Sequence, residues 1–320
     1  LRLAGRMTEI RMDELSFTNE EVQQLFKLVV NIELGEHAIE VLQSKTEGWI
    51  IALSLASMAI KRGADLDEFM KKFEGKLKTS SEYLIAEVLS SQSAEIQESL
   101  LFSSILNRFC ADILDDIFLA DTNLTGSQFI NHLLSDNMLV IDLDIEGIWY
   151  RYHHLFQELL KAQLSTKLTR DKIAQLHIMA SKWFEEHGYL EEAMDHASNA
   201  NKPERAAEIV KSHRLSILDK NQYDLLERLQ RKIPMTLIKS DAKLILVESY
   251  IQFNHGNFVR LGELEEKMNM LAQEAGREDL MDGEYYFFIG FVSLFLKGDL
   301  PGALKSFDLG LETVPESASE

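Results

Sequence analysis

The chain contains one cysteine, Cys110, and only four prolines among its 320 residues. A single cysteine excludes an internal disulfide and any metal cluster built from several thiolates, and it fits a reducing compartment. Because so few prolines and only 16 glycines interrupt the chain, long helices can form along most of it. We therefore expect a mainly α-helical protein that works in the cytoplasm.

Long apolar runs are also missing from the sequence. The longest aromatic-rich run, residues 285–296, spans 12 residues, whereas a membrane-spanning helix needs about 20. We therefore expect a buried helix there and no membrane as a partner. Basic residues are scarce relative to acidic ones, and the formal net charge of −19 makes nucleic acid an unfavourable direct ligand.

The first part of the chain carries clear signals for the start of a helix. Thr18 and Glu21 have the spacing of a capping box, in which each side chain bonds to the other residue's backbone N–H. A helix should therefore begin near Asn19, and we assign residues 18–90 to one helical domain. Its remaining helices are predicted over 36–44, from 50 onward, over 65–73 and over 80–90.

Residues 91–167 have the pattern of a winged-helix domain. Alternation of apolar and polar residues on both sides of residues 145–147 predicts a β-hairpin, which would form the wing. A helix rich in leucine on its buried face follows the hairpin directly. The three helices in front of the hairpin are predicted over 94–106, 109–119 and 126–136.

Many winged helices read DNA, but this one lacks the cations that such binding requires. The 42 residues between Arg108 and Arg151 contain eight acidic residues and no lysine or arginine. The helix in the position of a recognition helix therefore has no cation with which to neutralise a phosphate. We expect this domain to do something other than bind DNA directly.

Residues 168–320 read as helix after helix, with glycine or proline in the short turns. The last segment is close to a tetratricopeptide unit, because Gly298 ends one helix and the small Ala303 permits close helix contact. Phe307 follows on the same face, and Pro315 ends the pair. We therefore predict tetratricopeptide-like repeats, which stack into an array with a concave binding face.

One predicted helix of this array carries three phenylalanines on a single stripe. Phe288, Phe291 and Phe295 are spaced so that all three lie on one helical face. The stripe fits a core between stacked helices, and the alternative is a face on which a sugar or peptide stacks.

The dipeptide His153–His154 stands where the wing meets the following helix. A helix N-terminus favours anions, because its first N–H groups are free and the helix dipole is positive there. A histidine at that place can donate a further hydrogen bond to a phosphate oxygen. The alternative is a pair of packing or surface histidines. Zinc is disfavoured, because His154 and Glu158 have helical spacing but lack a third ligand, so we predict no metal site.

Several segments together resemble one protein family. TEGWIIALSLASMAI (46–60), YRYHHLFQELLKAQL (150–164) and HIMASKWFEEHGYLEEAMDHA (177–197) are similar to segments of the LuxR-type large ATP-binding transcriptional regulators. This group belongs to the signal-transduction ATPases with numerous domains. The start of the chain, LRLAGRMTEIRMDELSFTNEE, resembles the exit from the family's nucleotide-binding domain, and residues 1–17 would be its exit strand.

The resemblance implies a nucleotide site that is completed by a P-loop domain. In such proteins the helical and winged-helix domains close over ADP, or ATP with Mg²⁺. Gly48, Trp49 and Ile50 would then line the adenine, and His153 would contact the β-phosphate. Relatives often carry a proline where this chain has Trp49, for which interdomain packing is the alternative role.

The sequence contains no Gly-x-x-x-x-Gly-Lys-Ser/Thr motif. We therefore expect a fragment without the P-loop domain and without the C-terminal helix-turn-helix of the LuxR type. Such a fragment is not an enzyme, has no catalytic residues and holds no cofactor firmly by itself. By the resemblance, the full-length protein would be a slow signalling ATPase.

The leading hypothesis is the regulatory middle portion of an ATP-dependent LuxR-type regulator. Its expected partners are its own P-loop domain, a small-molecule or protein inducer on the repeats, and DNA only through the C-terminal domain. Self-association on activation is a further option. The alternative function is a tetratricopeptide-type scaffold with no nucleotide role, and an enzyme is disfavoured because no nucleophile–base pair is recognisable.

Overall fold

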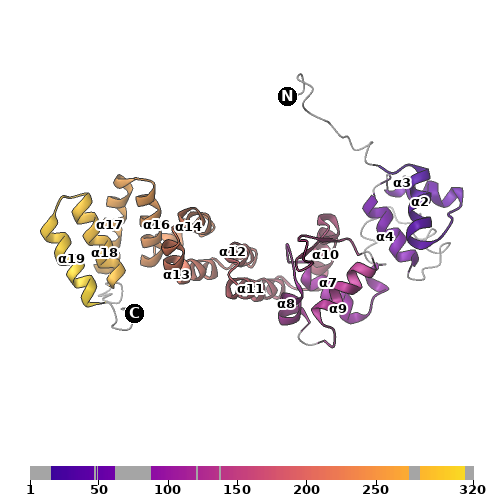
Figure 1. Ribbon diagram of the computed structural model, residues 1–320, viewed down its shortest axis with the longest axis horizontal. Helices are drawn as coiled ribbons and strands as arrows, with labels where there is room; N and C mark the ends of the chain where they lie inside the picture. Colours follow the sequence, from indigo (N-terminus) through magenta and orange to yellow (C-terminus); the bar gives the residue numbers. More distant parts are fainter. Residues whose placement is uncertain are drawn as a thin grey trace, which may run out of the picture. The chain divides into compact units, whose positions relative to one another are not determined.

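The computed structural model is mainly helical, as the sequence predicts, and contains a small two-stranded sheet (Figure 1). The chain divides into two compact units, residues 1–176 and residues 177–320, and each is described by itself. Four features that the sequence analysis names lie largely or wholly outside the described residues: the predicted exit strand, the helix over 65–73, Trp49 and Pro315. The described residues are 16–46, 48, 50–61, 88–119, 122–136, 138–273 and 282–313.

Three helices make up the described part of the N-terminal segment: α2 (Asn19–Val30), α3 (Glu36–Thr46) and α4 (Ile50–Lys61). The predicted capping box is confirmed. The hydroxyl of Thr18 accepts a hydrogen bond from the N–H of Glu21 at 3.3 Å, and the carboxylate of Glu21 accepts one from the N–H of Thr18 at 2.8 Å. Phe26, Leu42 and Leu53, one from each helix, are fully buried and form the core of this segment.

The winged helix forms in the predicted order. Its elements are α7 (Ala94–Ser103), α8 (Ala111–Ile113), the π-helical turn η2 (Leu114–Phe118), α9 (Gly126–Ser135), β1 (Val140–Asp142), β2 (Tyr150–Tyr152) and α10 (His154–Lys167). The predicted hairpin is confirmed, because β1 and β2 pair antiparallel with Ile141 opposite Arg151. Phe109 forms an isolated antiparallel bridge to β2, since its backbone N–H and C=O each bond to Tyr150 at 2.8 Å.

The aromatic rings of the wing close the core of this domain. Tyr152 is 1% exposed, and its hydroxyl lies 2.7 Å from the hydroxyl of Ser103 on α7. Phe109 and Phe156 pack their rings against Tyr152, with centroids 4.8 and 5.8 Å away. Gln157 of α10 donates to the carbonyls of Ser104 and Leu106, at 2.9 and 2.6 Å, so α10 is fastened to the end of α7.

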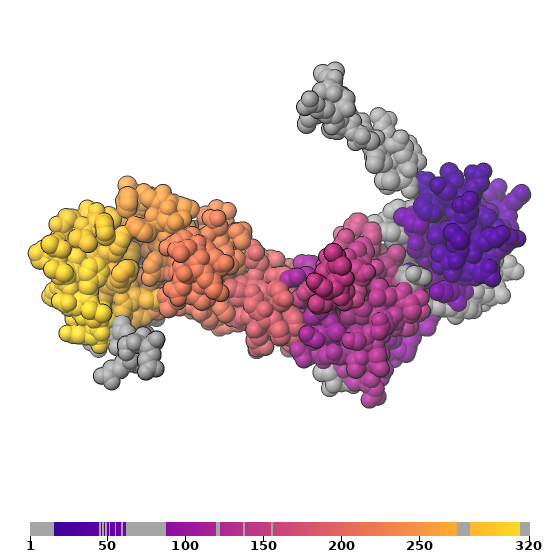
Figure 2. All heavy atoms as spheres, in the orientation of Figure 1, coloured from indigo at the N-terminus to yellow at the C-terminus, as the bar shows by residue number. Residues whose placement is uncertain are grey.

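The second part of the chain is a succession of helices that pack on their neighbours (Figure 1). In Figure 2 the helices from α16 to α19 form one continuous surface, coloured orange to yellow. Ala303 is fully buried and Gly298 follows the end of α18, as the sequence predicts. The helices are α11 (Arg170–Glu186), α12 (Leu190–Asn199), α13 (Pro203–Asp219), α14 (Tyr223–Gln230), α15 (Met235–Ile238), α16 (Ala242–Asn254), α17 (Phe258–Gln273), α18 (Gly283–Phe295) and α19 (Leu300–Glu312).

A group of ion pairs ties α13, α16 and α18 together. Arg214 of α13 reaches both carboxylate oxygens of Glu284, with its Nε atom 3.1 Å from Oε1. Lys243 of α16 lies 2.6 Å from the same carboxylate and also pairs with Asp282, which caps the N-terminus of α18. The side chains of Arg214 and Glu284 are 15% and 17% exposed, so this pairing is shielded from solvent. None of the described helices is both long and apolar enough to span a bilayer.

Candidate functional site

Gly48 lies in the turn between α3 and α4, with a φ angle of +71°. Its carbonyl accepts a 2.8 Å hydrogen bond from the backbone N–H of Phe17, and Gln43 donates to the carbonyl of Phe17 at 2.7 Å. A Cβ atom at position 48 would stand 2.6 Å from that Phe17 oxygen. The packing of the chain itself therefore explains the glycine, because only glycine combines this φ angle with so close an approach.

Ile50 is the first residue of α4 and is partly exposed. Trp49 lies outside the described residues, so its role stays a prediction. α4 is apolar around much of its circumference, and Ala52, Leu53 and Ala56 are buried against the neighbouring helices. The adenine contact predicted for Gly48, Trp49 and Ile50 also stays a prediction.

His153 occupies the N-cap position of α10, and its side chain makes no capping bond. Its backbone is fixed at both ends, because the N–H donates to Leu139 at 2.7 Å and the carbonyl accepts from Gln157 at 3.0 Å. The Nδ1 atom of the ring is buried and has no hydrogen-bond partner among the described residues. Burial lowers the pKa of His153, and the charges of His154 and Arg151 act in the same direction.

These features fit a phosphate group at the start of α10. The first turn of this helix contains no acidic residue that would repel an anion, and the side chain of His153 does not cap its first N–H groups. An imidazole with an unpartnered ring nitrogen can supply one more polar contact. His154, by contrast, is exposed to solvent, which agrees with the surface alternative for that residue.

The described residues contain no group of three His, Cys, Asp or Glu side chains that could hold a metal ion.

Two basic side chains of the winged helix contact other side chains of the same domain. His132 of α9 lies 2.9 Å from the amide oxygen of Gln92 and 3.6 Å from the carboxylate of Asp136. The guanidinium of Arg108 lies over the ring of Trp149, 4.1 Å from its centroid, in a cation–π contact. α9 itself carries no lysine or arginine, so this surface offers no array of cations for phosphates.

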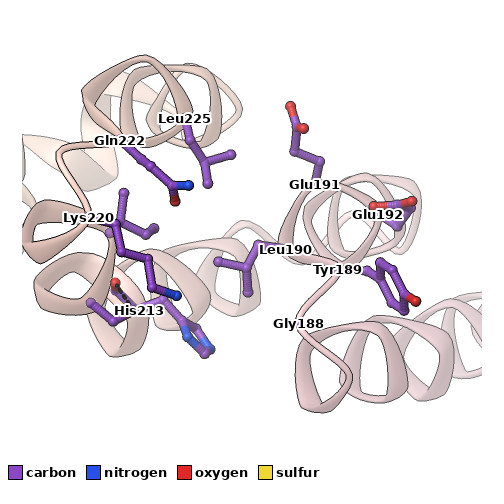
Figure 3. A pocket seen from close by; sticks show the side chains of 11 residues that line it. Gly188, Tyr189, Leu190, Glu191, Glu192, His213, Lys220, Gln222 and Leu225 are labelled. Carbon is purple, nitrogen blue, oxygen red and sulfur yellow. Dashed lines mark hydrogen bonds between the residues drawn. The ribbon is translucent and has the colours of Figure 1, made fainter.

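A polar pocket of about 350 Å³ lies between the start of α12 and the connection from α13 to α14. Two of its polar lining side chains already have partners in the protein, because His213 bonds to Glu185 at 3.0 Å and Glu191 bonds to Arg228 at 2.8 Å. Figure 3 shows His213, Lys220 and Gln222 on one side of it, Tyr189, Glu191 and Glu192 on the other, and Leu190 between them.

The predicted phenylalanine stripe of α18 divides between core and surface. Phe288 is 5% exposed and belongs to the core of this region, whereas Phe295 is 64% exposed. Phe291 is partly buried and contacts both Phe295 and Phe253, with ring centroids 4.5 and 4.7 Å apart. The core interpretation is therefore correct for Phe288 and wrong for Phe295.

Sequence reasoning missed the residues of other helices that meet this stripe. Tyr223 of α14, together with Tyr250 and Phe253 of α16, lines a pocket with Phe291. Periodicity within one helix reveals its own face but not which distant helix will cover that face. Clusters of aromatic residues near the ends of α14 and α16 were the available signal, and they do not specify a contact.

Comparison with known proteins places these observations in a family context. Residues 85–172 match the family described as the MalT winged helix domain. The chain is 28% identical over 246 residues to the serine/threonine-protein kinase PknK of Mycobacterium tuberculosis (strain ATCC 25618 / H37Rv), which covers 77% of this chain and 22% of that protein. It is 25% identical over 277 residues to the HTH-type transcriptional regulator MalT of Yersinia pestis (strain Pestoides F), which covers 86% of this chain and 30% of that protein.

The chain thus spans less than a third of the length of these relatives. The predicted winged helix and the predicted resemblance to the LuxR-type regulators are confirmed.

Proposed function

We propose that this chain, whose winged helix is of the MalT type, is the regulatory middle portion of an ATP-dependent transcriptional regulator. Its helical and winged-helix parts would close over ADP or ATP that a P-loop domain holds. The repeats would bias that closure when an inducer binds. On this proposal the protein acts in the cytoplasm and reaches DNA through a separate helix-turn-helix domain.

The observation that carries the nucleotide role is the environment of His153. Its buried Nδ1 atom lacks a hydrogen-bond partner among the described residues, and buried polar atoms are otherwise almost always paired. The atom lies at the N-terminus of a 14-residue helix with no acid in its first turn. A phosphate oxygen placed there would accept hydrogen bonds from the first turn and from the ring.

The charge of the winged helix supports its use as a lid on a neighbouring domain. Direct DNA readers need several lysine or arginine contacts to phosphates, and α9 carries none. A nucleotide bound between two domains couples their arrangement to its own phosphates, which is linkage through a two-state interface. An ADP-bound closed form and an ATP-bound open form would be the two states.

The test uses a longer chain that includes the P-loop domain. ADP affinity would be measured by isothermal titration calorimetry for the wild type, for His153→Ala and for the matched control His154→Ala. We expect a loss of about tenfold for His153→Ala, which corresponds to about 1.4 kcal/mol and suits one contact to a charged group. His154→Ala should bind ADP like the wild type, because His154 is exposed.

An unchanged ADP affinity in His153→Ala would remove the phosphate role of this residue. If the longer chain bound no nucleotide at all, the scaffold alternative would replace the regulator. The genomic sequence on either side of residues 1–320 gives a second test. A P-loop upstream and a basic helix-turn-helix downstream support the regulator, and their absence supports a tetratricopeptide-type scaffold.

A further inference from the structure

An apolar pocket of about 220 Å³ lies where α14, α16, α17 and α18 meet. Its floor is formed by Leu261 and Phe288, which are 1% and 5% exposed. Its walls are aromatic and come from three different helices, so no single helix defines it. The lining residues are Tyr223, Ser249, Tyr250, Phe253, Leu261, Phe287, Phe288 and Phe291.

The rings around the mouth of this pocket are only partly covered. Phe253 is 44% exposed and Phe287 is 52% exposed, although each could bury a large apolar area. The rings of Phe253 and Phe291 meet edge to face, with centroids 4.7 Å apart and an angle of 82° between their planes. Aromatic side chains that line a pocket and keep part of their surface exposed can pack against a further aromatic ring.

The polar side-chain groups of the lining are two phenols and the hydroxyl of Ser249, which donates to the carbonyl of Ile245 at 2.8 Å. The hydroxyls of Tyr223 and Tyr250 make no hydrogen bond to any other described residue. Burial raises the pKa of Tyr250 to about 12; the carboxylate of Glu284 acts in the same direction and the cation of Arg214 in the opposite one. The Tyr250 hydroxyl therefore keeps its proton at neutral pH and can donate a hydrogen bond to a ligand.

The lining limits the charge and the size of an occupant. None of the eight lining residues carries a charged side chain. An ion would lose its hydration in such a pocket without gaining a partner. An apolar cavity of about 150 Å³ in another protein takes up benzene, so a pocket of about 220 Å³ accommodates one substituted ring or two fused rings.

We propose that this pocket binds a small, uncharged aromatic molecule that carries a hydroxyl or carbonyl oxygen. The ring of the ligand packs among Phe253, Phe287 and Phe291, and its oxygen accepts a hydrogen bond from the Tyr250 hydroxyl. Binding itself does not depend on the nucleotide role. The consequence that such a molecule is the inducer rests on the function proposed above.

The experiment titrates 2-naphthol into the whole chain, residues 1–320, without nucleotide. Calorimetry and the fluorescence of the naphthol should show saturable binding to one site. With 11 non-hydrogen atoms, each contributing roughly 0.5 kcal/mol, a dissociation constant of about 100 µM is expected. Phe253→Ala and Phe291→Ala should weaken it about tenfold or more, and Tyr250→Phe about threefold to tenfold.

Phe258→Ala is the matched control. Phe258 is 49% exposed, close to the 44% of Phe253, but it does not line the pocket. Its loss should leave naphthol binding unchanged. Circular dichroism of each variant checks that the helices are retained, and Phe253→Leu replaces Phe253→Ala if the latter unfolds, because leucine keeps volume but removes the ring.

Four outcomes would overturn the proposal. They are the absence of saturable binding, an equal loss of affinity in Phe258→Ala, displacement of naphthol by cyclohexanol at equal concentration, and equally tight binding of naphthalene-2-sulfonate. No binding together with a dimerisation that Phe253→Ala abolishes would assign the pocket to a second copy of the chain. None of these results bears on ADP affinity, so this proposal and the nucleotide role fail separately.

Discussion

The Nδ1 atom of His177 lies 2.8 Å from the Nδ1 atom of His196, where α11 meets α12. Both side chains are buried, with 9% and 3% of their surface exposed, and the ring of Phe184 stacks on that of His196 with centroids 5.4 Å apart. At this separation one nitrogen donates and the other accepts, so the tautomer of each ring determines that of the other. The packing of α11 against α12 thus includes a specific polar contact in its interior.

Replacing only one of these histidines should lower the free energy of unfolding by more than half of the loss that replacing both causes. His177→Leu or His196→Leu leaves the other ring without this hydrogen bond in a buried site, and each should lower the free energy of unfolding by about 2 kcal/mol. The double variant removes both polar atoms, so its loss should be smaller than the sum by about 1 kcal/mol or more. Urea unfolding of the four proteins measures this coupling, and strictly additive losses would contradict it.

The carboxylate of Glu284 should make the packing of α13, α16 and α18 sensitive to acid. Burial acts to raise its pKa, but the hydrogen bonds and charges of Arg214 and Lys243 outweigh burial and hold the pKa below its ordinary value of 4.5. A carboxyl group with a lowered folded-state pKa stabilises the fold fully above its unfolded pKa, and that contribution is lost as the pH falls through the folded pKa. The free energy of unfolding should therefore decrease below about pH 4.5.

Glu284→Gln tests this assignment. The variant should be less stable than the wild type by about 2 kcal/mol at pH 7, and it should lose less stability than the wild type on acidification. Glu263→Gln is the control, because Glu263 is 58% exposed and pairs with Arg260 of the same helix, which is worth about 0.5 kcal/mol or less. Identical pH profiles for Glu284→Gln and the wild type would show that another group controls acid unfolding.

Local signals in the sequence were sufficient for much of the fold. The start of α2 follows from Thr18 and Glu21, three residues apart, and the hairpin follows from alternation within one short segment. The helix predicted over 109–119 is different, because only 111–113 is α-helical and 114–118 forms a π-helical turn. Phe109 leaves the helix to pair with Tyr150, a partner 41 positions away that no local pattern announces.

The candidate sites were predictable only where a single segment carries the chemistry. The N-cap place of His153 follows from its position between hairpin and helix. The contact of Gly48 with Phe17 joins the turn before α4 to the segment before α2, and local spacing cannot foresee it. The same holds for Tyr250 and Phe291, because which helices pack together is decided by the whole arrangement of cores and turns.

We expect the side chain of Gln157 to contribute substantially to the stability of the winged helix. Its amide group donates to the carbonyls of Ser104 and Leu106, and Gln157→Leu would leave both carbonyls without that donor. We expect a loss of about 2 kcal/mol in the free energy of unfolding of this unit. Gln163→Leu, on the same helix, should have little effect, because no side-chain hydrogen bond of Gln163 is present among the described residues. Chemical denaturation, followed by tryptophan fluorescence, measures the stability of both variants. If the amide contact were unimportant, Gln157→Leu and Gln163→Leu would lower the free energy of unfolding equally.

The variant Gly48→Ala can show whether this glycine is needed for packing within the chain or for binding a nucleotide. Gly48→Ala places a Cβ atom 2.6 Å from the carbonyl oxygen of Phe17 at a φ angle of +71°, so it should destabilise its segment by about 2 kcal/mol or more. Gly35→Ala is the matched control, since a Cβ atom there meets nothing within 4 Å. Melting temperatures of the two variants test the packing role, which requires a clear decrease only for Gly48→Ala. If both variants melted like the wild type while Gly48→Ala alone weakened ADP binding in the longer chain, close approach of a nucleotide would be the reason for this glycine.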